Sequence, residues 1–173
     1  VDSFNAEYPN VSILRWDRDA EKNPRKYHTL LERFRSGQDQ VLVGTQMIAK
    51  GLHFPSVTLV GVVSADVGLQ IPDYRASERT FQILCQIAGR AGRGITPGRV
   101  IFQTYQPDNY AISSASKQDF QGFYNEEINF RQNHLNPPFS KLIRLLCMGR
   151  NKSRCEQIAF DLANEIRNYM INS

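Results

Sequence analysis

The stretch "VTLVGVVSAD", residues 57–66, decides the fold class. It is an almost unbroken run of apolar and β-branched residues that ends at Asp66, which is typical of a strand buried on both faces. Two similar runs precede it, at residues 11–16 ("VSILRW") and 40–46 ("QVLVGTQ"), and a fourth strand is predicted at 98–105 ("GRVIFQTY"). The sequence therefore predicts a sheet core.

Helical patterns separate these strands. In "NPRKYHTLLERFRSG", residues 23–37, Asn23 is the expected N-cap, Pro24 stands in the first turn and Gly37 stops the helix. A second helix is predicted over 77–93, "SERTFQILCQIAGRAGR". Apolar strands that alternate with helices predict an α/β fold, a parallel sheet with right-handed crossovers and flanking helices.

The pattern changes in the last third of the chain. A helix is predicted over 112–134, a strand over 139–147 and a helix over 152–171. One strand between two helices cannot form a sheet by itself. We therefore expect residues 1–108 to form one domain and 109–173 to begin a second, partial α+β domain whose other strands lie outside this sequence.

Composition sets limits on function. The 173 residues are 41% hydrophobic, which is ample for a packed core, and the net charge of +4 mildly favours polyanionic partners. Three cysteines without a C-x-x-C pair indicate neither a disulfide framework nor a metal site, and they favour a reducing, cytoplasmic setting. No membrane span or signal peptide is apparent, and a start at Val1 suggests a piece of a longer protein.

The stretch "CQIAGRAGRG", residues 85–94, carries the most informative cations. At about 100° per residue, Gln86, Arg90 and Arg93 share one face of a helix. A solvated basic face is the simplest interpretation. However, each helical glycine costs about 1 kcal/mol relative to alanine, so the glycine before each arginine indicates a close approach of the backbone to another surface. Planar, permanently charged guanidinium groups there suit phosphate.

A second polar stretch follows the strand at 40–46. "VGTQMIAKGLHFP", residues 43–55, lies at the carboxyl end of that strand, where open α/β sheets bind ligands. It is not a P-loop, because Lys50 is followed by glycine and not by serine or threonine. Thr45 and Gln46 can hydrogen-bond a sugar-phosphate backbone, with Lys50 adding charge. A plain polar connection between strand and helix is the alternative.

Together the two stretches are more specific than either alone. Residues 44–66 ("GTQMIAKGLHFPSVTLVGVVSAD") followed by 86–93 ("QIAGRAGR") resemble motifs V and VI of the superfamily two helicases. With "DYRASERTFQ" (73–82), "SILRWDRD" (12–19) and "FRQNHLNPPFSKLIRLLCMG" (130–149), nearly the whole chain is similar to the primosomal, replication-restart members of that superfamily.

This resemblance implies the second RecA-like lobe of an ATP-dependent 3′→5′ DNA helicase. In such helicases the absent first lobe brings the phosphate loop and the Mg²⁺-binding carboxylates, so the chain alone is expected to be inactive. Arg90 and Arg93 would reach the γ-phosphate of ATP as arginine fingers, Gln86 would couple phosphate state to lobe closure, and Gly51 would lie near the nucleotide. Loss of an arginine finger costs about 10³ to 10⁵ in turnover.

The resemblance also implies the remaining partners. Thr45, Gln46 and Lys50 would contact phosphates of forked or single-stranded DNA. His53 stands where many relatives have an aspartate for the ribose, which puts the sugar contact in doubt. Primosome and single-strand-binding proteins are further implied partners. Zinc, bound by cysteines in these helicases, would belong to sequence outside this chain.

A second hypothesis is a non-catalytic RecA-like module that binds nucleic acid or acts as a scaffold. The glycine-arginine spacing favours the motor, because a retired site has no reason to keep costly helical glycines. Weaker candidates have ordinary alternatives. These are surface positions for His28 and His134, a capping or turn role in place of a DNA-touching loop for 17–19, and a structural or arginine-pairing role for Asp66. Three aromatic residues at helical spacing are expected to pack in a core and not to stack on bases, namely Phe120, Phe123 and Tyr124.

Overall fold

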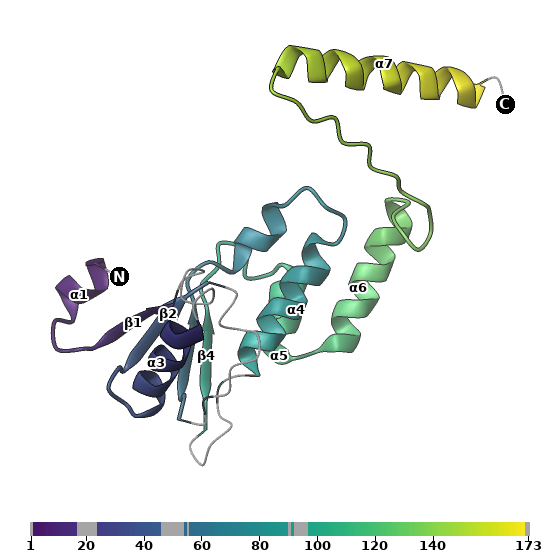
Figure 1. Cartoon of the computed structure of the whole chain (residues 1–173). Helices are drawn as coiled ribbons and strands as arrows, with labels where there is room; N and C mark the ends of the chain where they lie inside the picture. The colour runs from purple at the N-terminus through teal and green to yellow at the C-terminus, as the bar shows by residue number, and fades with distance from the viewer. Residues whose placement is uncertain are drawn as a thin grey trace. The chain divides into compact units, whose positions relative to one another are not determined.

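The computed structural model describes residues 2–16, 24–45, 54, 56–89, 91 and 97–171. The chain divides into two compact units, Val1–Phe130 and Arg131–Ser173. The first unit holds the strands and most of the helices, and the second holds an extended segment and one long helix (Figure 1).

The first pair of strands is parallel. The elements concerned are α1 (Asp2–Glu7), β1 (Ile13–Trp16), α3 (Pro24–Arg35) and β2 (Val41–Gly44), with Ile13 opposite Val41 and Trp16 opposite Gly44. Buried Leu14 and Trp16 pack with Leu30 and Leu31 of α3. The helix between two parallel strands confirms the βαβ arrangement that the sequence predicts.

Asp39 fixes α3 to this strand pair. Its side chain is 2% exposed. The Ser12 hydroxyl donates to the Asp39 carboxylate over 2.6 Å and Arg33 Nη2 donates over 2.9 Å. A buried carboxylate needs such partners, so Asp39 joins the entrance of β1 to the end of α3.

A second parallel pair carries the rest of the α/β pattern. It consists of β3 (Leu59–Val62) and β4 (Arg99–Phe102), in register from Leu59 opposite Arg99 to Val62 opposite Phe102, with η2 (Ala65–Gln70) and α4 (Ala76–Ala88) between them in sequence. Parallel strands joined through a helix confirm the predicted fold class, but the described strands form two separate two-stranded sheets and not the single sheet that the sequence predicts.

Burial of β3 and β4 differs from the prediction for 57–66. Val62 and Phe102 pack toward the helices, but Leu59 is 57% exposed and Ile101 is exposed as well. Exposure therefore alternates along each strand instead of vanishing on both faces. Within the described residues, helices cover one face of this strand pair, so the apolar run reflects more burial than this part of the chain supplies.

The predicted helix over 112–134 is two helices, α5 (Tyr110–Lys117) and α6 (Phe120–Asn133). Gln118 separates them with a left-handed φ of 54°, and its backbone N–H donates to the Ala115 carbonyl over 3.2 Å. Asn109 caps α5 by accepting from the Ala111 N–H over 3.0 Å. The core behind these helices is Ala65, Phe81, Leu84, Ala111, Ile112, Ala115 and Phe123.

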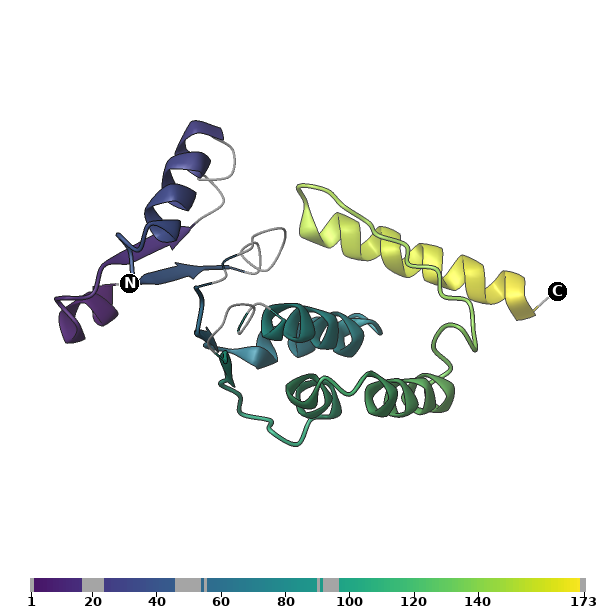
Figure 2. The ribbon, with the colours of Figure 1, turned by 90° about the horizontal axis from the view of Figure 1, so that it is seen from below.

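The second unit confirms one prediction and corrects another. The predicted helix over 152–171 is α7 (Lys152–Ile171). Residues 139–147, predicted as a strand, form no strand, because the described part of this unit offers no other strand to pair with. They belong to an extended segment that leads into α7 (Figure 2), and Leu145 and Cys147 of this segment line a hollow together with that helix. Among the described helices, none is both long and apolar enough to cross a membrane.

Candidate nucleotide and nucleic-acid site

Helix α4 has one buried face and one exposed polar face. Its buried residues, Ala76, Thr80, Phe81 and Leu84, point into the core. Arg79, Gln82 and Gln86 are exposed at the three-to-four-residue spacing of one helical face. The sequence predicts this orientation, and the described part of the helix has it. Gln86 is therefore accessible to a ligand or a neighbouring lobe.

The end of α4 corrects the helix predicted over 77–93. The helix ends at Ala88, so Gly89 follows the helix and does not stand inside it, and the Gly89 N–H donates to the Cys85 carbonyl over 3.0 Å. Gly89 has a φ of −66°, which any residue adopts, so this glycine is not required by a left-handed cap. The cost of a helical glycine does not apply to it, and a close approach to another surface stays a prediction. Arg90 and Arg93 lie outside the described residues.

The turn before α4 contains an acidic anchor that sequence reasoning missed. Asp73 Oδ2 lies 2.9 Å from Arg79 Nη1, and Asp73 Oδ1 accepts from the Arg75 N–H over 2.9 Å. That backbone hydrogen bond, followed by the charges of Arg79 and Arg75, lowers the pKa of Asp73 from its usual 3.8. The Arg75 guanidinium also lies 5.0 Å from the centre of the Tyr74 ring. Asp73 thus holds one cation of the polar face in place.

Asp66 ends the run that follows β3 and is 4% exposed. The Thr104 hydroxyl donates to Asp66 Oδ1 over 2.6 Å, and the Tyr105 N–H donates to Oδ2 over 3.1 Å. The Thr104 hydrogen bond is the main cause of a lowered pKa at Asp66. These bonds give Asp66 a structural role, because they join the carboxyl ends of β3 and β4.

Thr45 follows β2 directly, and its side chain is exposed. The other predicted DNA-contacting residues, Gln46 and Lys50, lie outside the described residues, as do Gly51 and His53. Further along, the Phe54 ring packs edge-on against Phe34 of α3 at 4.8 Å. The segment predicted to contact DNA therefore begins with Thr45 at the carboxyl end of β2, and Phe54, which follows it in the sequence, packs on α3.

The weaker candidate residues differ in how the structure places them. His28 and His134 are exposed, as predicted, and residues 17–19 lie outside the described part. Among the aromatic residues predicted to pack in a core, Phe123 is buried, but Phe120 and Tyr124 are exposed. The prediction was wrong for Phe120 and Tyr124, because α5 ends before Gln118 and the new helix α6 buries Phe123 but not these two residues.

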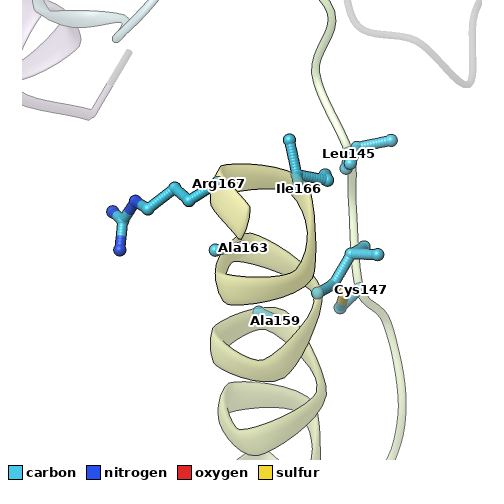
Figure 3. A pocket seen from close by; sticks show the side chains of 7 residues that line it. Leu145, Cys147, Ala159, Ala163, Ile166 and Arg167 are labelled. Carbon is cyan, nitrogen blue, oxygen red and sulfur yellow. The ribbon is translucent and has the colours of Figure 1, made fainter. Parts of the chain in front are cut away.

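The second unit contains an apolar hollow of about 350 Å³ between α7 and the extended segment. Leu145 and Cys147 face Ala159 and Ile166 across it, while the Arg167 guanidinium points away (Figure 3). Because the Arg167 guanidinium is directed away, the hollow itself is apolar and presents no group suited to phosphate.

Comparison with known proteins shows the family of the chain. Residues 3–94, more than half of the chain, match the family described as "Helicase conserved C-terminal domain". The chain belongs to this helicase family. The matched part includes both strands of the first pair, β3 and the whole of α4 with its exposed polar face.

The relatives are also consistent with one another. The chain is 42% identical over 163 residues to "Replication restart protein PriA" of Chlamydia pneumoniae, a match covering 94% of this chain and 21% of that protein. It is 47% identical over 131 residues to the protein of that name from Bacillus subtilis, covering 76% of this chain and 16% of the relative. Treponema pallidum has another, 41% identical over 159 residues, with coverage of 92% and 24%.

The alignments cover only a part of each relative. The chain spans between 16% and 24% of the length of these relatives. The similarity to them continues past residue 94, so it includes α5, α6 and residues of the second unit that the helicase family match does not reach.

Proposed function

We propose that this chain is the second motor lobe of an ATP-dependent DNA helicase that unwinds in the 3′→5′ direction and restarts replication. The supporting observation is the exposed polar face of α4, which leads directly into the two arginines of the "QIAGRAGR" stretch. The names of the relatives add the restart role. The ATP site would be completed by another lobe of the longer protein.

Arg90, Arg93 and Gln86 would form this lobe's share of the nucleotide site. ATP and Mg²⁺, when bound, supply the phosphoryl group that is cleaved and the cation that balances its charge. The two guanidinium groups would stabilise negative charge on the γ-phosphate as it develops. Exposure of Gln86 on α4 fits this site, because it leaves the amide free of the lobe's own core. The backbone near Gly51 would approach the nucleotide.

Thr45, Gln46 and Lys50 would contact the phosphates of a DNA strand. Thr45 is exposed at the carboxyl end of β2, where ligands of open α/β sheets bind. Contacts of this kind position the strand and do not read its sequence. The net charge of +4 favours them.

The proposed location and partners are based on the similarity to the relatives. We propose cytoplasmic action on forked or single-stranded DNA, together with primosome and single-strand-binding proteins. Residues 109–173 would begin a further domain, and zinc would be bound elsewhere in the longer protein. By itself the chain would hydrolyse no ATP, because it lacks the phosphate loop.

The test uses the longer protein and forked DNA. We expect ATP hydrolysis that depends on DNA, and displacement of a strand only when the loading strand offers a 3′ to 5′ path. The control is a fork of opposite polarity. If the longer protein binds DNA without hydrolysing ATP, the scaffolding alternative takes the place of the motor.

A further inference from the structure

Two helices that follow the family match support α4 from behind. The apolar face of α4 packs on α5, with Phe81 and Leu84 in one core with Ala111, Ile112 and Ala115 (Figure 1). Both α5 and α6 come after residue 94, where the match to the helicase C-terminal domain ends. The core that holds α4 therefore includes elements outside the matched region, together with Ala65 inside it.

An aromatic stack joins α4 to α6. The rings of Phe81 and Phe123 lie 4.1 Å apart between centroids with an angle of 7° between their planes, and they are 5% and 4% exposed. The Tyr110 ring of α5 stacks on the same Phe123 at 5.8 Å. Stacked rings in a buried core resist sliding and tilting, because their contacts depend on offset and angle.

A buried hydrogen bond secures this stack. The Tyr110 hydroxyl donates to Glu127 Oε2 over 2.7 Å, and Glu127 is 5% exposed. A carboxyl group is rarely buried without a partner, since its desolvation is costly. Glu127 stands one helical turn after Phe123 on α6. The bond therefore fixes the rotation of α6 about its axis and keeps Phe123 against Phe81.

We propose that Phe123, Tyr110 and Glu127 are positioning residues that hold α4 in the orientation in which its exposed polar face serves the nucleotide site. The inference deepens the proposed function and rests on it, because α4 carries Gln86 and leads in sequence to Arg90 and Arg93. Close-packed interfaces do not deform smoothly, so the loss of one of these contacts would shift α4 as a unit, together with Gln86.

The test measures base pairs unwound per ATP hydrolysed by the longer protein, a ratio that does not depend on how much of the sample is folded. We expect Phe123→Leu and Glu127→Leu to lower this ratio on the order of tenfold, since misplacement of about 1 Å at a distance can cost up to 10²-fold. Glu127→Gln keeps an acceptor for Tyr110 and should restore most of the ratio.

Tyr124→Leu is the matched control, because Tyr124 is the next residue on α6 and is exposed. It should leave the ratio unchanged. Tyr110→Phe removes only the hydroxyl and gives a milder loss, which keeps the test valid if Phe123→Leu does not fold. If folded variants at all three positions unwind a normal number of base pairs per ATP, the inference is overturned, whereas the proposed motor function is not affected. Absence of ATP hydrolysis in the unaltered protein would remove the proposed function itself.

Discussion

The hydroxyl of Thr104 donates to the carboxylate of Asp66 over 2.6 Å and joins the carboxyl ends of β3 and β4. The parallel pair depends on this bond at the edge where its ligands would bind, because Asp66 also accepts the Tyr105 N–H. The turn after β4 is held by the same threonine, whose Oγ1 accepts the Gln106 N–H over 2.9 Å.

Thr104→Val should therefore lower the thermal midpoint at neutral pH. The folded pKa of Asp66 is lowered from 3.8, so its contribution to stability is present above the unfolded pKa and is lost as the pH falls through the folded pKa. The variant should differ most from the original near pH 7 and converge with it in acid. Thermal unfolding at a series of pH values measures this, with Thr104→Ser as the control that keeps the hydroxyl. A constant difference at every pH would contradict the assignment.

Asp39→Ala should destabilise the first strand pair by about 2 kcal/mol, because two hydrogen bonds to a buried carboxylate are lost. Urea unfolding of the chain measures the free energy. Arg35→Ala is the comparison, since Arg35 Nη1 lies 3.8 Å from Glu32 and both side chains are more than half exposed. It should change the free energy by less than about 0.5 kcal/mol. Equal effects would mean that Asp39 has no special role.

DNA binding by the chain should be weak and strongly dependent on salt. Lys50→Ala should lower the affinity for all sequences alike and reduce the slope of log K against log[salt] by about 1. Fluorescence anisotropy with a labelled single strand at several salt concentrations measures both. Lys152→Ala, on α7 and paired with Glu156 at 3.7 Å, is a matched charge control. An unchanged slope for Lys50→Ala would exclude a phosphate contact there.

Much of the fold could be predicted because its rules are local. Helix α3 is marked by Pro24 and by apolar residues that include Leu30 and Leu31. Strand β3 is marked by the apolar run at 57–66. The break at Gln118 could not be predicted, since a left-handed glutamine leaves no sequence pattern. Exposure of Leu59 was also missed, because an apolar residue does not say whether this part of the chain covers it.

In the candidate site, too, some residues could be predicted from the sequence and others could not. The exposed position of Gln86 follows from helical periodicity, so the sequence was enough. Asp73 and Thr104 were missed because their partners, Arg79 and Asp66, are brought near by turns and strand pairing. For Asp73 a weak signal existed, an acidic residue after a proline and just before a helix, which is common at helix starts.

The most direct test of the motor is the kcat for DNA-dependent ATP hydrolysis by the longer protein with Arg93→Ala. Gln82→Ala, on the same exposed face of α4, is the control and should leave kcat nearly unchanged. We expect Arg93→Ala to lower kcat about 10³-fold or more with nearly unchanged nucleotide affinity, because the contact matures in the transition state. An unaltered kcat, or a loss confined to nucleotide affinity, would contradict the arginine finger and with it the motor.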